Sequence, residues 1–104
     1  MHFGAFDGDR LVGIVSLYRE ARHDGPPGGW RLRGMATEAD VRGAGFGAAL
    51  AAACIEHVAA AGGSELWCNA RMGAVGFYRR AGFEVVSAAF EIEGIGPHVV
   101  MARS

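Results

Sequence analysis

The stretch DVRGAGFGAAL, residues 40–50, places three glycines at alternate positions just ahead of an alanine-rich run. Glycine loses more conformational freedom on folding than any other residue, so three glycines this close together reduce stability. A backbone without side chains allows a ligand to approach closely, and at the start of a helix that ligand is usually a phosphate. The stretch therefore predicts a phosphate-binding turn followed by a helix.

Two common nucleotide-binding motifs fit these glycines poorly. A Walker-type phosphate loop is excluded, because no Gly-Lys-Ser/Thr follows and the chain has no lysine. A dinucleotide fingerprint, G-x-G-x-x-A, matches Gly43, Gly45 and Ala48, but the polar residues 37–40 separate it from the preceding strand. The acidic residue expected about 20 positions later is Glu65, which would open the next strand instead of ending it. Dinucleotide binding is therefore disfavoured.

A third motif, Arg42-x-x-Gly45-x-Gly47, lies between a strand and the first turn of a helix. Backbone N–H groups in that turn have no partner in the helix, and together with the helix dipole they favour a pyrophosphate. A side chain at Gly45 or Gly47 would push the phosphates away, while Arg42 could pair with one of them. The alternative for Arg42 is a solvated surface arginine.

The rest of the chain predicts a sheet with two helices. A turn of the Asp-Gly type at residues 7–9 joins a hairpin, whose second arm is apolar on both faces and so typical of a strand covered on both sides. Those faces are Leu11, Val15 and Leu17, and Val12, Ile14 and Tyr18. The buried stripe of the first helix is expected at Phe46, Leu50, Cys54 and Val58. In chain order we expect strands at 2–6, 10–20 and 30–37, a helix at 45–61, a strand at 65–70, a helix at 73–81, and strands at 83–94 and 97–103.

Composition indicates one globular domain. A length of 104 residues suffices for one hydrophobic core, and 51% hydrophobic with 20% charged residues indicates a folded chain. A net charge of -1 does not provide the basic surface of a nucleic-acid-binding protein. Cys54 and Cys68 lack the spacing of a disulfide or metal pair and are expected as buried free thiols. No apolar run approaches the ~18 residues of a membrane span, so we expect a cytoplasmic protein, and we expect no metal site.

Two segments resemble parts of one enzyme family. LRGMATEADVRGAGFGAALAAACIEHV, residues 32–58, is similar to the acetyl-CoA-binding strand, turn and helix of the GNAT superfamily of N-acetyltransferases. LWCNARMGAVGFYRRAGFE, residues 66–84, resembles the strand and helix that follow, with FYRRAGF as the recurring signature. The resemblance covers the chain from about residue 2. It implies an α/β (α+β) fold in one domain of residues 1–104, with a mixed, largely antiparallel sheet flanked by helices in the order β-β-β-α-β-α-β-β.

The resemblance also implies an activity. The protein would be an N-acetyltransferase with acetyl-CoA as cosubstrate, and the acetyl group would pass by direct attack to a primary amine held in the same cleft. The amine would belong to a small molecule or a peptide. A CoA-binding or regulatory module of the same fold without turnover is the alternative from another class, and a dinucleotide-binding domain is a third.

Cofactor-binding residues follow from the same resemblance. Backbone groups of Met35, Ala36 and Thr37 would align the pantetheine arm and polarise the thioester carbonyl. Asn69 would bond the pantetheine arm, although a strand-end cap explains an asparagine there nearly as well. The residues that would hold the pyrophosphate are Arg42, Gly43, Ala44, Gly45, Phe46, Gly47 and Ala48.

Tyr78 would act as the general acid that protonates the departing thiolate, because a phenol is protonated at neutral pH. The alternative is a core tyrosine packed at helical spacing with Phe77. His98 is a candidate base, because histidine side chains exchange protons near neutral pH, and an ordinary strand histidine is as good an explanation. His23, Glu20 and a water molecule are further candidates.

Two features depart from the family. Members usually begin with a strand and one or two helices that wall the acceptor pocket, and from the resemblance we expect this segment to be missing here. Residues 31–37 contain no carboxylate, although some members place their base there. Because exposed sheet edges and apolar patches are normally covered, we expect a homodimer that pairs through residues 83–103. The alternative is a truncated monomer.

Overall fold

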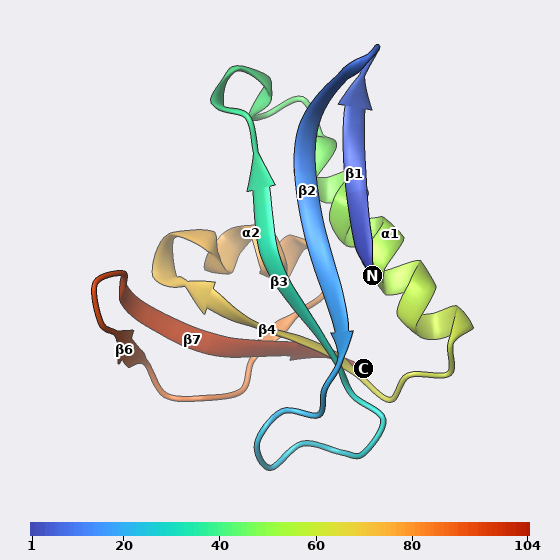
Figure 1. Cartoon of the computed structure of the whole chain (residues 1–104). Coiled ribbons are helices and arrows are strands. Elements are labelled where there is room, and N and C mark those ends of the chain that lie inside the picture. The colour runs from blue at the N-terminus through green and yellow to red at the C-terminus, as the bar shows by residue number, and fades with distance from the viewer.

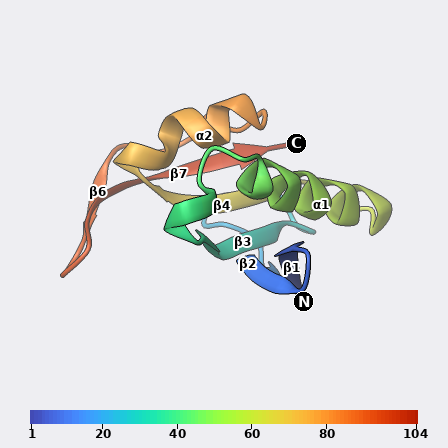
Figure 2. The same ribbon diagram turned by 90° about the horizontal axis from the view of Figure 1, so that it is seen from above.

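One twisted sheet of seven strands carries both α-helices on the same face (Figure 1, Figure 2). The structure is a computed structural model that describes residues 1–104. Its elements are β1 (His2–Asp7), β2 (Arg10–Arg19), β3 (Trp30–Thr37), η1 (Ala39–Val41), α1 (Phe46–Ala60), β4 (Leu66–Arg71), η2 (Met72–Ala74), α2 (Val75–Arg80), β5 (Glu84–Val85), β6 (Phe90–Ile92) and β7 (Gly96–Arg103). The strand order is β1-β2-β3-β4-β7-β5, with β6 also paired to β7. Only β3 and β4 are parallel, which confirms the expected mixed, largely antiparallel sheet. Neither helix is long and apolar enough to cross a membrane.

The parallel junction between β3 and β4 is very short. It consists of two residue pairs, Trp30 with Leu66 and Arg31 with Trp67, whereas β4 and β7 pair along the whole of β4. Beyond these two pairs β3 and β4 move apart, as Figure 1 shows. The sheet therefore has two halves whose strands are joined at one end and diverge at the other, and we call this divergence of β3 from β4 the V (Figure 1).

A β-bulge lies beside the V. Between Ile14 and Ser16 the register of β2 against β3 shifts, so that Val15 faces two residues of β3, Gly34 and Met35. Gly34 has a φ of +68°, in the left-handed region that favours glycine. Bulges bend a strand and redirect its side chains, and this one lies where β3 leaves β4.

The hydrophobic core lies between the sheet and the helices. Leu50, Cys54 and Val58 of α1 are buried, as their four-residue spacing predicted, whereas Phe46 at the first turn is only partly buried. Cys54 and Cys68 are both free and buried, which confirms that expectation. The strand residues that face the helices in this core are Val15, Leu17, Trp30, Leu32, Leu66, Cys68, Ala70, Val99 and Met101.

The opposite face of the sheet, which we call the outer face, has no helix over it and is open along β2 (Figure 2). This corrects the expectation that β2 is buried on both faces, because the side chains of Leu11, Ile14 and Tyr18 are 49%, 50% and 41% exposed. Both helices pack against the other face, where Val15 and Leu17 are buried (Figure 2). The apolar residues on the outer face of β2 therefore lack a covering layer.

The closing part of the sheet also differs from the expected single strand at residues 83–94. Two short strands, β5 and β6, replace it, and each pairs with β7. Between them, the Ser87 hydroxyl accepts a hydrogen bond of 2.8 Å from the backbone N–H of Val100, where a continuous strand would offer a carbonyl. A side-chain bond of this kind competes with the strand ladder and lets the chain leave it.

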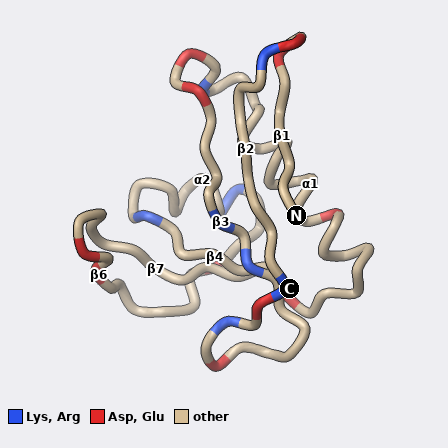
Figure 3. Tube along the Cα trace, in the orientation of Figure 1, with Lys and Arg blue, Asp and Glu red and all other residues tan.

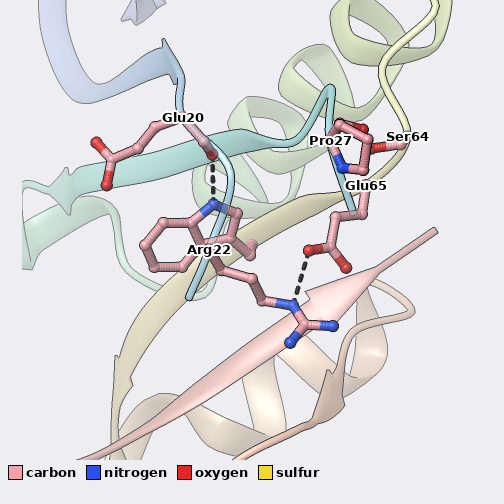
Figure 4. Close-up of polar contacts among 6 residues, drawn as sticks. Glu20, Arg22, Pro27, Ser64 and Glu65 are labelled. Atoms are coloured by element: carbon pink, nitrogen blue, oxygen red, sulfur yellow. Dashed lines mark hydrogen bonds and ion pairs between the residues drawn. The ribbon is translucent and has the colours of Figure 1, made fainter. Parts of the chain in front are cut away.

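The loop at residues 20–29 fastens the closed end of the V (Figure 4). The Arg22 Nε donates to the carboxylate of Glu65 at 2.7 Å, and Glu65 is 7% exposed. The indole N–H of Trp67 donates to the backbone carbonyl of Glu20 at 2.7 Å. Because Trp67 belongs to the junction of β3 and β4, these bonds hold the connection between β2 and β3 against the start of β4.

We expect Glu65→Gln to lower the free energy of unfolding by about 1–2 kcal/mol, because a neutral hydrogen bond replaces a charge-assisted one at a buried position. Urea unfolding followed by circular dichroism would show a lower midpoint with an unchanged m-value. Glu20→Gln is the matched control, since the Glu20 side chain is 48% exposed and pairs with Arg31 at 3.3 Å. Its expected change is within about 0.5 kcal/mol. Equal losses in the two variants would contradict the importance of burial at Glu65.

Candidate functional site

The three glycines ahead of α1 are needed for different reasons. Gly43 and Gly45 have φ angles of +86° and +90°, which side chains rarely allow, and no atom of the chain lies near the position of a Cβ on either residue. Gly47 lacks this constraint, but a Cβ there would lie 3.3 Å from the Phe77 ring. Two glycines therefore set the turn, and the third allows α1 to pack closely against α2.

The turn leaves a row of backbone N–H groups without acceptors. The first bond along α1 runs from the N–H of Ala49 to the carbonyl of Gly45 at 3.0 Å. The N–H groups of Gly45, Phe46, Gly47 and Ala48 find no acceptor in the chain. These donors, the helix dipole and the open space over Gly45 fit a pyrophosphate group. The pyrophosphate assignment stays a prediction, and the geometry of the turn supports it.

An ion pair holds the segment that leads into the turn. Two guanidinium nitrogens of Arg10 each donate to one carboxylate oxygen of Asp40 at 2.7 Å, which connects the β1–β2 turn to η1. The hydrogen bonding from Arg10 lowers the pKa of the Asp40 carboxyl, so the pair persists under mildly acidic conditions. Arg42 is exposed and has no carboxylate partner. It is therefore free to meet an anion bound at the turn.

The end of β3 lies directly beside the turn. The Cγ2 atom of Thr37 is 3.9 Å from the position that a Cβ atom on Gly47 would occupy. Met35 belongs to the bulge and is half-buried, while Ala36 is exposed. The backbone segment assigned to the pantetheine arm therefore runs from the bulge to the glycine turn along one side of the V.

Tyr78 is buried in α2, with its side chain 7% exposed. Its ring packs edge-to-face against Phe77 and Phe83, with centroid distances of 5.1 and 5.3 Å. Burial raises the pKa of the phenol, with smaller contributions from Cys68 and Cys54, so the phenol is protonated at neutral pH. The hydroxyl has no partner in the chain and is not among the fully buried polar atoms. Tyr78 is thus a core residue whose proton remains available, and its catalytic role stays a prediction.

Asn69 and His98 lie on the outer face. Asn69 follows Trp67 by two residues on β4, borders the V, and has no side-chain hydrogen bond within the chain. His98 pairs across the sheet with Arg71, the next outward residue of β4, and is 5% exposed. Its Nδ1 lies 2.9 Å from the carbonyl of Gly96. If Nδ1 carries the proton of the neutral ring, Nε2 is left as the proton acceptor.

The other base candidates lie at the closed end of the V. The His23 side chain is 97% exposed beside Asp24, and the Glu20 carboxylate is engaged by Arg31. Both belong to the loop at residues 20–29, far from the glycine turn in Figure 1. The structure therefore does not bring them to the predicted site.

One hollow of the surface lies outside the predicted site. A hollow of about 540 Å³ is lined by Arg79, Gly82, Phe83, Glu84 and Val85, and it includes none of the predicted site residues. No group of three or more His, Cys, Asp or Glu side chains is placed to hold a metal ion.

Two supporting contacts were not predicted from the sequence. Phe77 fills the space over Gly47, and its only signal was helical spacing within α2. The pair of Arg10 and Asp40 joins residues 30 positions apart, and no local pattern indicates it. Both contacts position the glycine turn, so they belong to the site although neither side chain is assigned to a ligand.

The fold and the site now allow comparison with known proteins. A family model described as acetyltransferase (GNAT) domain matches residues 1–104. The chain belongs to the GNAT family of acetyltransferases. It is 33% identical over 107 residues to the uncharacterized N-acetyltransferase YitI of Bacillus subtilis (strain 168), and the match covers 99% of this chain and 70% of that protein. This GNAT domain is therefore of the N-acetyltransferase type.

Solved structures show the same fold. An aminoglycoside 6'-N-acetyltransferase complexed with coenzyme A has a TM-score of 0.81 at 19% identity, covering 98% of this chain and 71% of that one. Escherichia coli ElaA has a TM-score of 0.81 at 22% identity, covering 99% of this chain and 67% of that one. At these identities the likeness shows the fold alone. The family and the coenzyme A complex together support the use of an acyl-CoA by the GNAT domain.

We expect Gly45→Ala to weaken coenzyme A binding at least about tenfold, because a Cβ at a φ of +90° distorts the turn and enters the space over its N–H groups. Isothermal titration calorimetry measures the affinity. Gly94→Ala is the matched control, since Gly94 has a φ of +79° and equally open surroundings in the turn between β6 and β7. The control carries the same kind of strain, yet its affinity should not change. Similar losses in both variants would show that general strain, not the turn, is responsible.

Proposed function

We propose that this GNAT domain transfers the acetyl group of acetyl-CoA to a primary amine, with both substrates bound at the V. The observation that carries the proposal is the row of unpaired N–H groups at the start of α1, located beside the end of β3. Such a row binds the pyrophosphate that joins the two halves of coenzyme A. In this proposal the arm that follows runs between the two strand edges, which do not pair beyond the short junction.

The two strands that border the V have separate roles in this proposal. The backbone of Met35, Ala36 and Thr37 on β3 aligns the arm and donates toward the thioester carbonyl oxygen, where negative charge develops. Asn69 on β4 bonds the arm from the other side, which suits an amide that has no partner within the chain. Arg42 supplies a cation to the phosphates.

The reaction requires a neutral amine and a proton for the leaving sulfur. The amine nitrogen attacks the thioester carbonyl carbon, a C–N bond forms and the C–S bond breaks. The thiolate takes a proton from Tyr78, whose phenol is protonated because burial raises its pKa. Holding the amine and the thioester together supplies much of the rate acceleration, because it removes the entropy cost of their encounter.

The proton lost by the amine needs an acceptor. His98 is one candidate, because its Nδ1 is placed to donate to Gly96 and Nε2 is then free to accept. Water in the V is the other. The strand β3 carries no carboxylate that might serve.

A screen of primary amines with detection of released thiol tests the proposal. Acetyl-CoA consumption that depends on an added amine, with one acetylated product per CoA released, supports it. Tight acetyl-CoA binding without CoA release for any amine would instead support a CoA-binding module of the same fold.

We expect Tyr78→Phe to reduce turnover by ~10²–10⁴, the usual contribution of general acid catalysis, with little change in acetyl-CoA affinity. The substitution keeps the ring that packs on Phe83 and removes only the hydroxyl. Because the pKa of Tyr78 is raised above the ordinary value near ~10, the wild-type acid should not be lost as the pH rises to that value. Unchanged turnover under conditions where chemistry limits the rate would leave Tyr78 with a packing role only.

We also propose a homodimer that pairs through residues 83–103. Val85, Val86 and Ile95 in this segment are 37%, 43% and 54% exposed, which supports an apolar contact there. Light scattering over a dilution series measures the assembly. A monomer at micromolar concentration that still acetylates an amine would contradict the dimer.

A further inference from the structure

The V can be approached from two sides. The glycine turn and both helices lie on one face of the sheet, and this face is the side of the predicted coenzyme A site (Figure 2). With acetyl-CoA in the V from that side, the amine must arrive from the outer face. Of the side chains that border the V on the outer face, Asn69 is assigned to the arm of acetyl-CoA, so those on the β3 edge meet the acceptor first.

Arg33 and Asn69 occupy equivalent positions on the two edges of the V. The last pair of the parallel junction is Arg31 with Trp67. Arg33 lies two positions after Arg31 on β3, and Asn69 lies two positions after Trp67 on β4. Strand side chains two positions apart point to the same face. Leu32 and its neighbours in the core face the helices, so these four side chains belong to the outer face.

The guanidinium of Arg33 is exposed, lies near an aromatic ring and has no carboxylate partner. It lies over the ring of Tyr18, 5.9 Å from the ring centroid, and forms no ion pair. Its neighbour Arg31 lies over the Trp67 ring at 5.1 Å and pairs with Glu20 at 3.3 Å. The Nε of Arg31 is buried without a hydrogen-bond partner. Arg33 is therefore the arginine of this edge whose charge no carboxylate of the chain pairs with.

The strands around the V contain basic residues and no acidic ones. No aspartate or glutamate occurs in β2, β3, β4 or β7. Of the eleven acidic residues, six lie in turns and loops and the others lie in β1, η1, α1, β5 and β6 (Figure 3). The arginines of these four strands are Arg10, Arg19, Arg31, Arg33, Arg71 and Arg103. Arg71 follows Asn69 by two residues, so a second outward arginine without an ion pair lies along the β4 edge.

We propose that the acceptor is a primary amine that also carries an anionic group, a carboxylate or a phosphate, and that Arg33 selects it. This inference rests on the proposed acetyl transfer. The planar guanidinium can donate two parallel hydrogen bonds to either kind of anion. An amine of the same size without an anionic group would leave the guanidinium of Arg33 without an anionic partner, and would gain no binding energy from its charge.

An exposed arginine gains little from a counterion in water, so selection by Arg33 depends on its contact with Tyr18 and on the loss of water when the acceptor binds. Stacking on Tyr18 reduces the freedom that Arg33 has to lose when it binds, and a guanidinium on an aromatic face keeps its donors free at the edge. An acceptor that fills the mouth of the V also displaces water from the contact, which strengthens it. Both effects favour selection of the anion once the ternary complex forms.

Matched acceptor pairs test the inference on the wild-type protein. The pairs are glycine, β-alanine and 4-aminobutyrate against their primary amides, and O-phosphoethanolamine against ethanolamine. We expect the anionic member of at least one pair to have a kcat/KM about 10- to 100-fold higher, and we expect sodium chloride to reduce this preference. The carboxylate and phosphate pairs distinguish the two sources of negative charge.

Substitutions at Arg33 then assign the effect. Arg33→Met should remove the preference by lowering kcat/KM for the anionic member alone, with an unchanged KM for acetyl-CoA, and Arg33→Lys should restore part of it. Arg19→Met is the matched control, since Arg19 also stacks on a ring of the same sheet, at 5.1 Å from Trp30, but on the helix side. Equal kcat/KM for the members of every pair, or equal loss in the Arg33 and Arg19 variants, would overturn the inference and leave the acetyl transfer intact. Release of no CoA with any amine would overturn both.

Discussion

The pairing of β3 and β4 over only two residue pairs is the constraint on which the site depends. Parallel strands normally gain stability by extending their ladder, and this pair stops after two residues on each strand. The junction is held from outside by Arg22, Glu65 and Trp67, so the closed end of the V remains fixed while the open end diverges. The bulge at Gly34 lies where the divergence begins. A continuous ladder would occupy the strand edges between which we propose that the thioester and the amine meet.

The glycine turn keeps a local sequence that costs stability, and the proposed binding of a pyrophosphate gives a reason for it. Gly43 and Gly45 occupy conformations that favour glycine, and no side chain caps the four free N–H groups at the start of α1. In an ordinary helix an N-cap residue would satisfy one of those groups and add about 1 kcal/mol. Here the N–H groups keep no partner in the chain. The turn is supported instead by residues far from it in the sequence, through the Arg10–Asp40 pair and the ring of Phe77.

Local patterns in the sequence predicted the helices and most strands, but not which of their faces other parts of the chain cover. The four-residue spacing of Leu50, Cys54 and Val58 identified the buried side of α1, because helix periodicity depends on nearby residues only. The faces of β2 were mistaken, because an apolar side chain such as Ile14 does not reveal whether another layer covers it. The same limit applies to the site. Motif spacing pointed to the turn and Tyr78, whereas the position of Arg33 opposite Asn69 depends on strand register, which no local pattern encodes.

The distribution of charge around the V bears on how the amine loses its proton. No carboxylate lies on β2, β3, β4 or β7. The candidates to accept the proton of the amine along these strands are therefore His98 and a water molecule. A strong base is less necessary if the ammonium form of the acceptor is already disfavoured. In the proposed complex the anionic group of the acceptor pairs with Arg33, so the positive charge that remains along the V is that of Arg71, which has no ion pair. A like charge nearby lowers the pKa of an ammonium group, so Arg71 would favour the neutral amine while Arg33 selects the anionic end of the same acceptor.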